Sequence, residues 1–202
     1  MTDVIYPNYF LGSWTATSTL TSISGAPSSL RELDEAKPIT YNVRFVDGGG
    51  GRVIADREYN SVNYALSTLG KDAVLGYVQD GPNKGTASIL AGGNVFDVVV
   101  LAVGRTQENI GEDWEKGGCF RCAENTRSVI SKSRSSGDAG GGGAALSDVE
   151  TVSQWKLGEN GEIVGEQISR GFGVPNETQA IRERSILAKD VRGYEVVLRK
   201  RS

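Results

Sequence analysis

Apolar and polar residues alternate along several short stretches of the chain, most clearly at residues 38–46. Apolar or aromatic side chains occupy every second position there, namely Ile39, Tyr41, Val43 and Phe45. Because successive side chains of a strand point to opposite faces, this pattern predicts a half-buried β-strand. Asp47 and four consecutive glycines follow, and residues 52–55 resume the extended pattern. The two segments therefore predict a β-hairpin.

Further strand candidates are separated by residues typical of turns. Strong turn signals lie at residues 80–83, 92–93 and 159–161. The other strand candidates are residues 11–23, 73–78, 86–90, 94–103, 126–133, 149–157, 162–170 and 193–201. Many short strands joined by tight turns predict a mainly β fold, either an antiparallel barrel or a sandwich.

One segment, residues 56–69, has helical rather than alternating spacing. Its apolar positions recur every three or four residues, and Gly70 follows as a stop signal. Asp56 is placed to cap the first turn of this helix. The functional alternative is that Arg57 and Asn60 line the mouth of a barrel and hold an anionic ligand or a partner carboxylate.

Length and composition indicate one domain. The chain has 202 residues, of which 38% are hydrophobic and 23% charged, and domains usually have about 100–200 residues. We expect residues 1–202 to form a single domain, with the Gly/Ser-rich stretch at about 133–146 as a connecting loop. The longest apolar run, residues 95–103, contains Asp97. It is far shorter than the roughly 20 residues of a spanning helix, so we expect no transmembrane segment and at most a peripheral contact with a membrane.

Charge and rare residues exclude several classes of function. The 22 basic and 25 acidic residues are mixed along the chain and give a net charge of −3, so we expect no nucleic-acid partner. The chain has no histidine and two cysteines. This removes Ser/His/Asp and Cys/His catalysis and almost every zinc site. We therefore expect no enzymatic activity, no catalytic residue, no metal and no cofactor.

The two cysteines, Cys119 and Cys122, form a C-x-x-C motif. A metal site would need further Cys or His ligands, which the chain does not offer. The remaining interpretations are structural or unpaired thiols, a local disulfide or a redox pair. In an extended strand the two side chains would face opposite sides, so a disulfide would require a turn.

An acidic segment close to this motif carries Trp114 between Asp113 and Glu115. Its composition predicts a solvated loop, and an exposed indole in such a loop often marks a contact surface. We therefore treat Trp114 as a candidate contact for a ligand or a partner.

Gly12 and Trp14 form a G-x-W string near the N-terminus. It resembles the opening of the lipocalin and wider calycin group, in which a short helical turn precedes the first strand and a basic residue of the last strand covers the indole. The resemblance implies an antiparallel calycin/lipocalin-like β-barrel of about 8–10 strands with one short helix. Arg199 or Arg201 would be the cation over Trp14.

Three longer strings, residues 6–14, 53–60 and 148–155, resemble an uncharacterised lipocalin-like family of cyanobacteria and plastids. The resemblance implies a place in the thylakoid lumen of a plastid, reached with a presequence that this chain lacks. It suggests a non-enzymatic accessory subunit that docks onto proteins of a photosynthetic membrane complex, a photosystem. The alternative is a carrier of a small apolar ligand, a pigment or a lipid. A carrier requires a cavity lined by small apolar residues, whereas a docking subunit would fill its interior with side chains.

Overall fold

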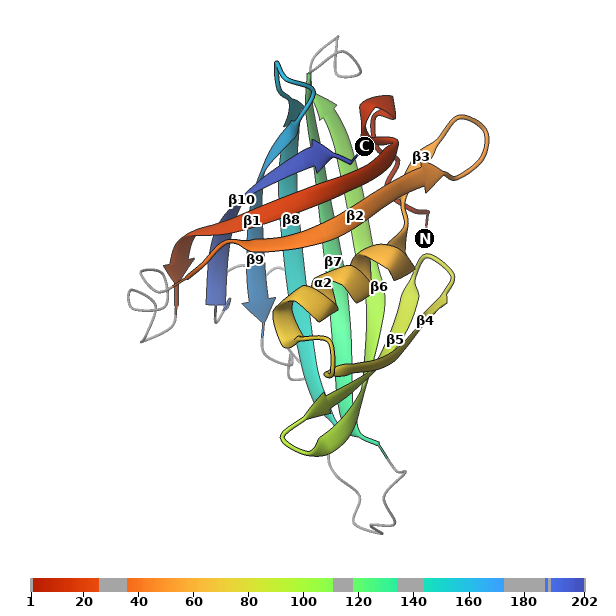
Figure 1. Cartoon of the computed structure of the whole chain (residues 1–202), viewed down its shortest axis with the longest axis vertical. Coiled ribbons are helices and arrows are strands. Elements are labelled where there is room, and N and C mark those ends of the chain that lie inside the picture. The colour runs from red at the N-terminus through yellow and green to blue at the C-terminus, as the bar shows by residue number, and fades with distance from the viewer. Residues whose placement is uncertain are drawn as a thin grey trace, which may run out of the picture.

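The computed structural model describes residues 2–25, 36–110, 118–133, 144–172, 188 and 190–201. These residues form one ten-stranded antiparallel sheet that curls into a half-barrel, with one α-helix (Figure 1). The strands are β1 (Gly12–Ser24), β2 (Ile39–Asp47), β3 (Val53–Ala55), β4 (Val74–Asp80), β5 (Lys84–Ala91), β6 (Asn94–Ile110), β7 (Cys119–Lys132), β8 (Ala145–Leu157), β9 (Ile163–Phe172) and β10 (Asp190–Lys200). The helices are the 3-10 turn η1 (Asn8–Phe10) and α2 (Arg57–Leu69). The predicted mainly β, lipocalin-like architecture with one short helix is confirmed.

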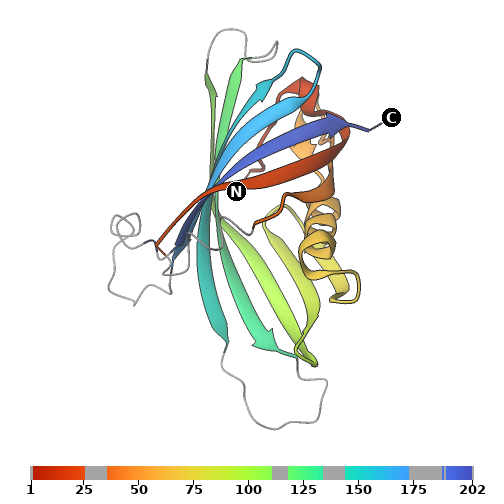
Figure 2. The same ribbon diagram turned by 60° about the vertical axis from the view of Figure 1, so that its left-hand side comes forward.

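The strand order is β3-β2-β1-β10-β9-β8-β7-β6-β5-β4, so β3 and β4 are the two edges. Among the described residues these edges do not pair with each other, and we call the place where they face one another the seam. Helix α2 follows β3 and precedes β4 in the chain, so it carries the chain from one edge of the sheet to the other. Figure 2 shows it on the inner side of the curled sheet. The half-barrel is therefore closed at the seam by a helix.

Most predicted elements are present, and the two largest differences in length are in β6 and β7. β6 was expected to end at residue 103 and continues to Ile110, and β7 begins at Cys119 rather than near residue 126. The added parts pair with each other, for example Arg105 with Glu124 and Gln107 with Cys122. These polar residues have weak strand propensity, and cross-strand pairing overrides it. Residues 134–143 of the predicted Gly/Ser-rich loop lie outside the described residues.

Large aromatic side chains fill one end of the half-barrel. Phe10 and Phe120 are fully buried, and Phe10 contacts Phe45 and Trp155 at ring-centre distances of 4.9 and 5.9 Å. Tyr6 joins this cluster, and its backbone N–H bonds to the edge strand β3. Aromatic rings therefore make up much of the core at this end.

The G-x-W string lies at the same end. Trp14 is 1% exposed, and its indole N–H donates to the Phe10 carbonyl at 2.6 Å. The predicted cation is wrong by one position, because Lys200, not Arg199 or Arg201, lies over the ring, with Nζ 5.6 Å from its centre. Lys200 is paired with Trp14 across β1 and β10, so its side chain is on the same face of the sheet.

Candidate functional site

Two adjoining hollows lie at the seam and beside it. A cavity of about 220 Å³ lies inside the half-barrel, between α2 and strands β4–β7. A wider groove of about 760 Å³ lies between the β2–β3 hairpin and the β4–β5 turn. Arg57, Gln79 and Pro82 line both. The groove therefore adjoins the cavity, and we take the two together as the candidate site.

Helix α2 forms the roof of the cavity because its first turn is tied to β2. The Asp56 carboxylate caps the helix by accepting from Tyr59 N–H at 3.1 Å, as the sequence predicts, and also accepts from Arg44 Nε at 2.8 Å. The Asn60 side chain accepts from the Arg44 N–H at 2.7 Å and donates to its carbonyl at 3.1 Å. None of the α2 side chains is fully buried. The helix is thus held by its N-terminus and covers a space that it does not fill.

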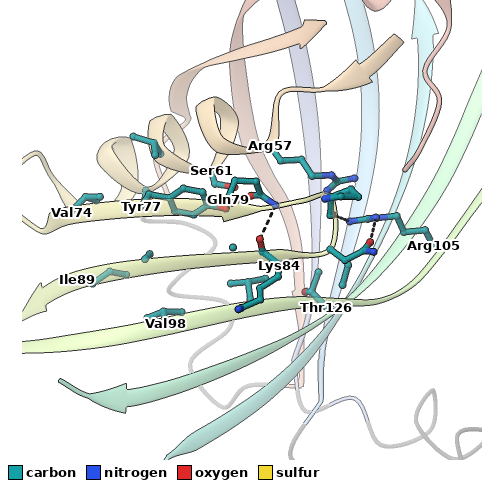
Figure 3. A pocket seen from close by; sticks show the side chains of 18 residues that line it. Arg57, Ser61, Val74, Tyr77, Gln79, Lys84, Ile89, Val98, Arg105 and Thr126 are labelled. Atoms are coloured by element: carbon teal, nitrogen blue, oxygen red, sulfur yellow. Dashed lines mark hydrogen bonds between the residues drawn. The ribbon is translucent and has the colours of Figure 1, made fainter. Parts of the chain in front are cut away.

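The cavity walls are mostly small and apolar. Side chains from the helix and from three strands contribute, including Val62, Ala65, Val74, Ala87, Val98 and Ala102. In Figure 3, Val74, Ile89 and Val98 lie toward one end and the two arginines toward the other. An apolar space with polar groups at one end is the usual form of a small-molecule site.

Two arginines of the cavity wall, Arg57 and Arg105, bond to two carboxylates that do not line the cavity, Asp3 and Glu124. Arg57 donates from Nε to Asp3 at 3.1 Å and from Nη2 to Asp3 and to Glu124 Oε1, the latter at 2.9 Å. Arg105 donates from Nε to the same Glu124 oxygen at 2.6 Å. We call Asp3, Arg57, Arg105 and Glu124 the charge cluster. It joins the N-terminal segment, α2, β6 and β7 at one point.

Burial and charge act in opposite directions on Arg57. Burial lowers the pKa of its guanidinium, since it disfavours the charged form. The hydrogen bond to Asp3 and the charges of Glu124 and Asp3 outweigh burial, so the pKa of Arg57 is raised. Arg57 therefore remains a cation throughout the physiological pH range.

Two further polar side chains of the cavity, Tyr77 and Gln79, are hydrogen-bonded. Tyr77 Oη donates to Gln79 Oε1 at 2.7 Å. Gln79 Nε2 donates to the carbonyls of Gly81 and Lys84, at 2.5 and 3.0 Å. The Tyr77 ring lies over Gly85, where an added Cβ would be 2.2 Å from the hydroxyl oxygen. Glycine at this position therefore lets the tyrosine form part of the wall.

The structure separates the three residues predicted as ligand or partner contacts. Arg57 lines both hollows. Asn60 lines neither, because its amide is used to hold α2 on β2, and its contact with a ligand or a partner stays a prediction. Trp114 lies outside the described residues.

The C-x-x-C motif is not a disulfide. Cys119 and Cys122 are both free and lie three residues apart on β7, where their side chains face opposite sides of the sheet. Cys122 is 6% exposed, and burial is the main cause that raises its pKa to about 12. Its thiol is a neutral member of the core. The described residues contain no group of three or more acidic, cysteine or histidine side chains placed to hold a metal ion.

Four residues of the site were missed by sequence reasoning: Asp3, Tyr77, Arg105 and Glu124. Asp3 and Glu124 are 121 positions apart in the sequence, and no local pattern joins them. Tyr77 falls inside a predicted strand and alternates with Gln79, but Val74 joins their face only through the bulge between Val74 and Gly76, which the sequence does not signal. Arg105 depends on a bulge in β6 that has no signature in the sequence beyond Gly104.

The described residues include no helix with the length and hydropathy that crossing a membrane would require.

Comparison with known proteins gives a family but no described activity. Neither the curated proteins nor the solved structures contain a significant match to the chain. A family model described as "Domain of unknown function (DUF6816)" matches residues 1–192. This match spans nearly the whole chain, and the protein therefore belongs to the DUF6816 family.

Proposed function

We propose that this protein is a carrier that binds a small, mainly apolar molecule in the cavity between α2 and strands β4–β7. The observation that carries the proposal is the unequal filling of the half-barrel. Aromatic rings pack one end, whereas a half-open cavity with mostly alanine and valine walls and a polar end lies at the other. A protein selected only for stability would cover these apolar walls with larger side chains, because apolar surface that stays accessible to water contributes nothing to folding.

The size of the cavity suits a small ligand. Its volume of about 220 Å³ exceeds that of an engineered apolar cavity of about 150 Å³ that binds benzene. It lies below the roughly 300–1,000 Å³ of sites for drug-sized molecules. The adjoining groove of about 760 Å³ could take the remainder of a longer molecule. A single ring or a short hydrocarbon chain therefore fits inside, with its polar end toward the groove.

The test is to fill the cavity and measure the loss of binding. Ala87 lines the cavity from β5, and Ala87→Leu places a larger side chain in it. Ala91 is exposed at the end of the same strand and lines neither hollow, so Ala91→Leu is the matched control. We expect n-octanol, measured by isothermal titration calorimetry, to bind the wild type and Ala91→Leu with equal affinity. Binding to Ala87→Leu should fall at least about tenfold, equivalent to about 1.4 kcal/mol.

Equal binding to all three proteins would place the ligand elsewhere, and no binding to the wild type would refute the carrier function for ligands of this size. Native mass spectrometry of the protein purified gently from its source would then identify the natural ligand as added mass. That added mass should be absent from Ala87→Leu and present in Ala91→Leu.

The second candidate function is docking to a photosynthetic membrane complex in the thylakoid lumen, as the resemblance suggests. The observation that favours it is a set of apolar side chains on the outer face of the sheet. Leu146 and Ile168 are 40% and 41% exposed, and each is paired across strands with a valine, Val129 or Val152. Exposed apolar groups of this kind are common at protein contacts.

Docking is tested by following the protein through a density gradient of gently solubilised source membranes. Migration with a photosystem supports docking, and Ile168→Lys should then shift the protein to the free fraction. Migration of the wild type only as a free species contradicts docking. The carrier function is then tested by the binding experiment alone.

A further inference from the structure

Three cationic residues line the cavity, and their number alone would favour an anionic ligand. They are Arg57, Lys84 and Arg105. Among the described residues that line the cavity there is no aspartate or glutamate. Lys84 Nζ lies 3.3 Å from Asp80 in an exposed ion pair, so its charge is directed to solvent. The nature of the ligand therefore depends on the two arginines.

Both arginines already contact carboxylates behind the cavity wall. Arg57 bonds to Asp3 and to Glu124, and Arg105 bonds to Glu124. The charge cluster thus contains two cations and two anions, and its formal net charge is zero. A ligand that enters the cavity meets arginines whose charge is balanced.

The hydrogen-bonding capacity of this end is also largely used. Besides Glu124, Arg105 donates from Nη1 to Asn83 Oδ1 at 2.8 Å and from Nη2 to the Pro82 carbonyl at 2.5 Å. Its side chain is only 4% exposed, and that of Arg57 is 19% exposed. Because water has little access here, a charge added to the cluster would be poorly screened.

We infer that the cavity selects uncharged molecules and rejects carboxylates and phosphates of similar size, and that Asp3 and Glu124 set this selectivity. The inference rests on the proposed function, since it concerns the ligand of the same cavity. A bound anion would either lose its hydration without gaining a free cation or displace a carboxylate from an arginine. An uncharged molecule removes its hydrocarbon surface from water and leaves the charge cluster intact.

The test compares two probes that differ only in their polar end, n-octanol and n-octanoate, at neutral pH and low ionic strength. We expect the wild type to bind octanol at least about tenfold more tightly than octanoate, measured by titration calorimetry. Equal or tighter binding of octanoate would overturn the inference and leave the carrier function intact. If neither probe binds, both the carrier function for ligands of this size and the inference are refuted.

Variants then test which residues set the selectivity. Asp3→Asn keeps the shape of the side chain and removes one negative charge, so the charge cluster becomes positive. Octanoate should bind this variant at least about tenfold more tightly than it binds the wild type, so the preference for octanol over octanoate should fall. Glu124→Gln should act in the same direction.

The matched control removes a carboxylate from an arginine on the outer face. Glu150 accepts from Arg170 at 2.6 Å and lines neither hollow, so Glu150→Gln changes the net charge of the protein equally. It should leave the binding of both probes unchanged. A gain in octanoate binding as large as that of Asp3→Asn would show that overall charge, not the charge cluster, controls selectivity, and would overturn the inference.

Discussion

The substitution Gly165→Ala tests how tightly the filled end of the half-barrel is packed. Gly165 pairs with Trp155 across β8 and β9, and the indole ring lies directly over it. An added Cβ would be 2.2 Å from Cε3 of the ring, whereas ordinary contacts begin near 3.4 Å. The ring would have to move by the difference, about 1.2 Å. Phe10, which is fully buried, contacts the indole in a T-shaped arrangement at 5.9 Å, so the ring has little room to move.

The expected loss of stability follows from two opposing effects. Overpacking a core costs about 1–3 kcal/mol. Replacing glycine by alanine also restricts the unfolded chain, which stabilises the fold by about 0.4–1 kcal/mol. We therefore expect Gly165→Ala to lower the free energy of unfolding by about 1–2 kcal/mol. The assay is urea unfolding followed by far-ultraviolet circular dichroism.

Two further variants isolate the role of the ring. Gly171 lies on the same strand, and an added Cβ there would be 3.8 Å from the nearest atom, so Gly171→Ala should be neutral or slightly stabilising. In a Trp155→Leu background the clash is absent, and Gly165→Ala should cost less than about 0.5 kcal/mol. The reasoning is refuted if Gly165→Ala leaves stability unchanged, or if its cost is the same with and without the ring.

Two other predictions concern the last strand and the buried thiol. Lys200→Met should lower the free energy of unfolding by about 0.5–1 kcal/mol, because it removes the cation over Trp14. Arg199→Met changes an exposed side chain and should lower it by less than about 0.5 kcal/mol. A larger loss for Arg199→Met than for Lys200→Met in the same urea assay would contradict the assignment of Lys200. The Cys122 pKa is raised from its ordinary value near 9 to about 12, so the unfolded chain releases this proton first. The free energy of unfolding should therefore not depend on this thiol at neutral pH. Above about pH 9 it should fall by up to about 1.4 kcal/mol per pH unit. In urea titrations, the free energy of unfolding of Cys122→Ala should fall less steeply over the same pH range.

The strands and the helix were predictable because their signals are local. The period-two pattern around Val43, the glycines after Asp47 and the cap at Asp56 each specify one element within a few residues. The identity of the cation over Trp14 could not be predicted from local sequence. Its identity depends on the register between β1 and β10, and a shift of one residue exchanges Lys200 for Arg199.

The candidate site was less predictable, since it depends on contacts between distant segments and on one irregularity of the sheet. In β6, Val98, Val100 and Ala102 face the cavity, and a regular strand would continue with Gly104 inside and Arg105 outside. A bulge between Ala102 and Gly104 shifts the register against β7 and pairs Arg105 with Glu124 on the inner face.

The extra residue of the bulge, Val103, is 48% exposed. The bulge costs regular pairing and leaves an apolar side chain in solvent, and its structural result is that Arg105 points into the half-barrel. Once Arg105 is inside, Glu124 must lie opposite it, because a lone buried cation would be strongly unfavourable. The balanced charges at the end of the cavity thus follow from a single inserted residue, and so does the expected preference for uncharged ligands.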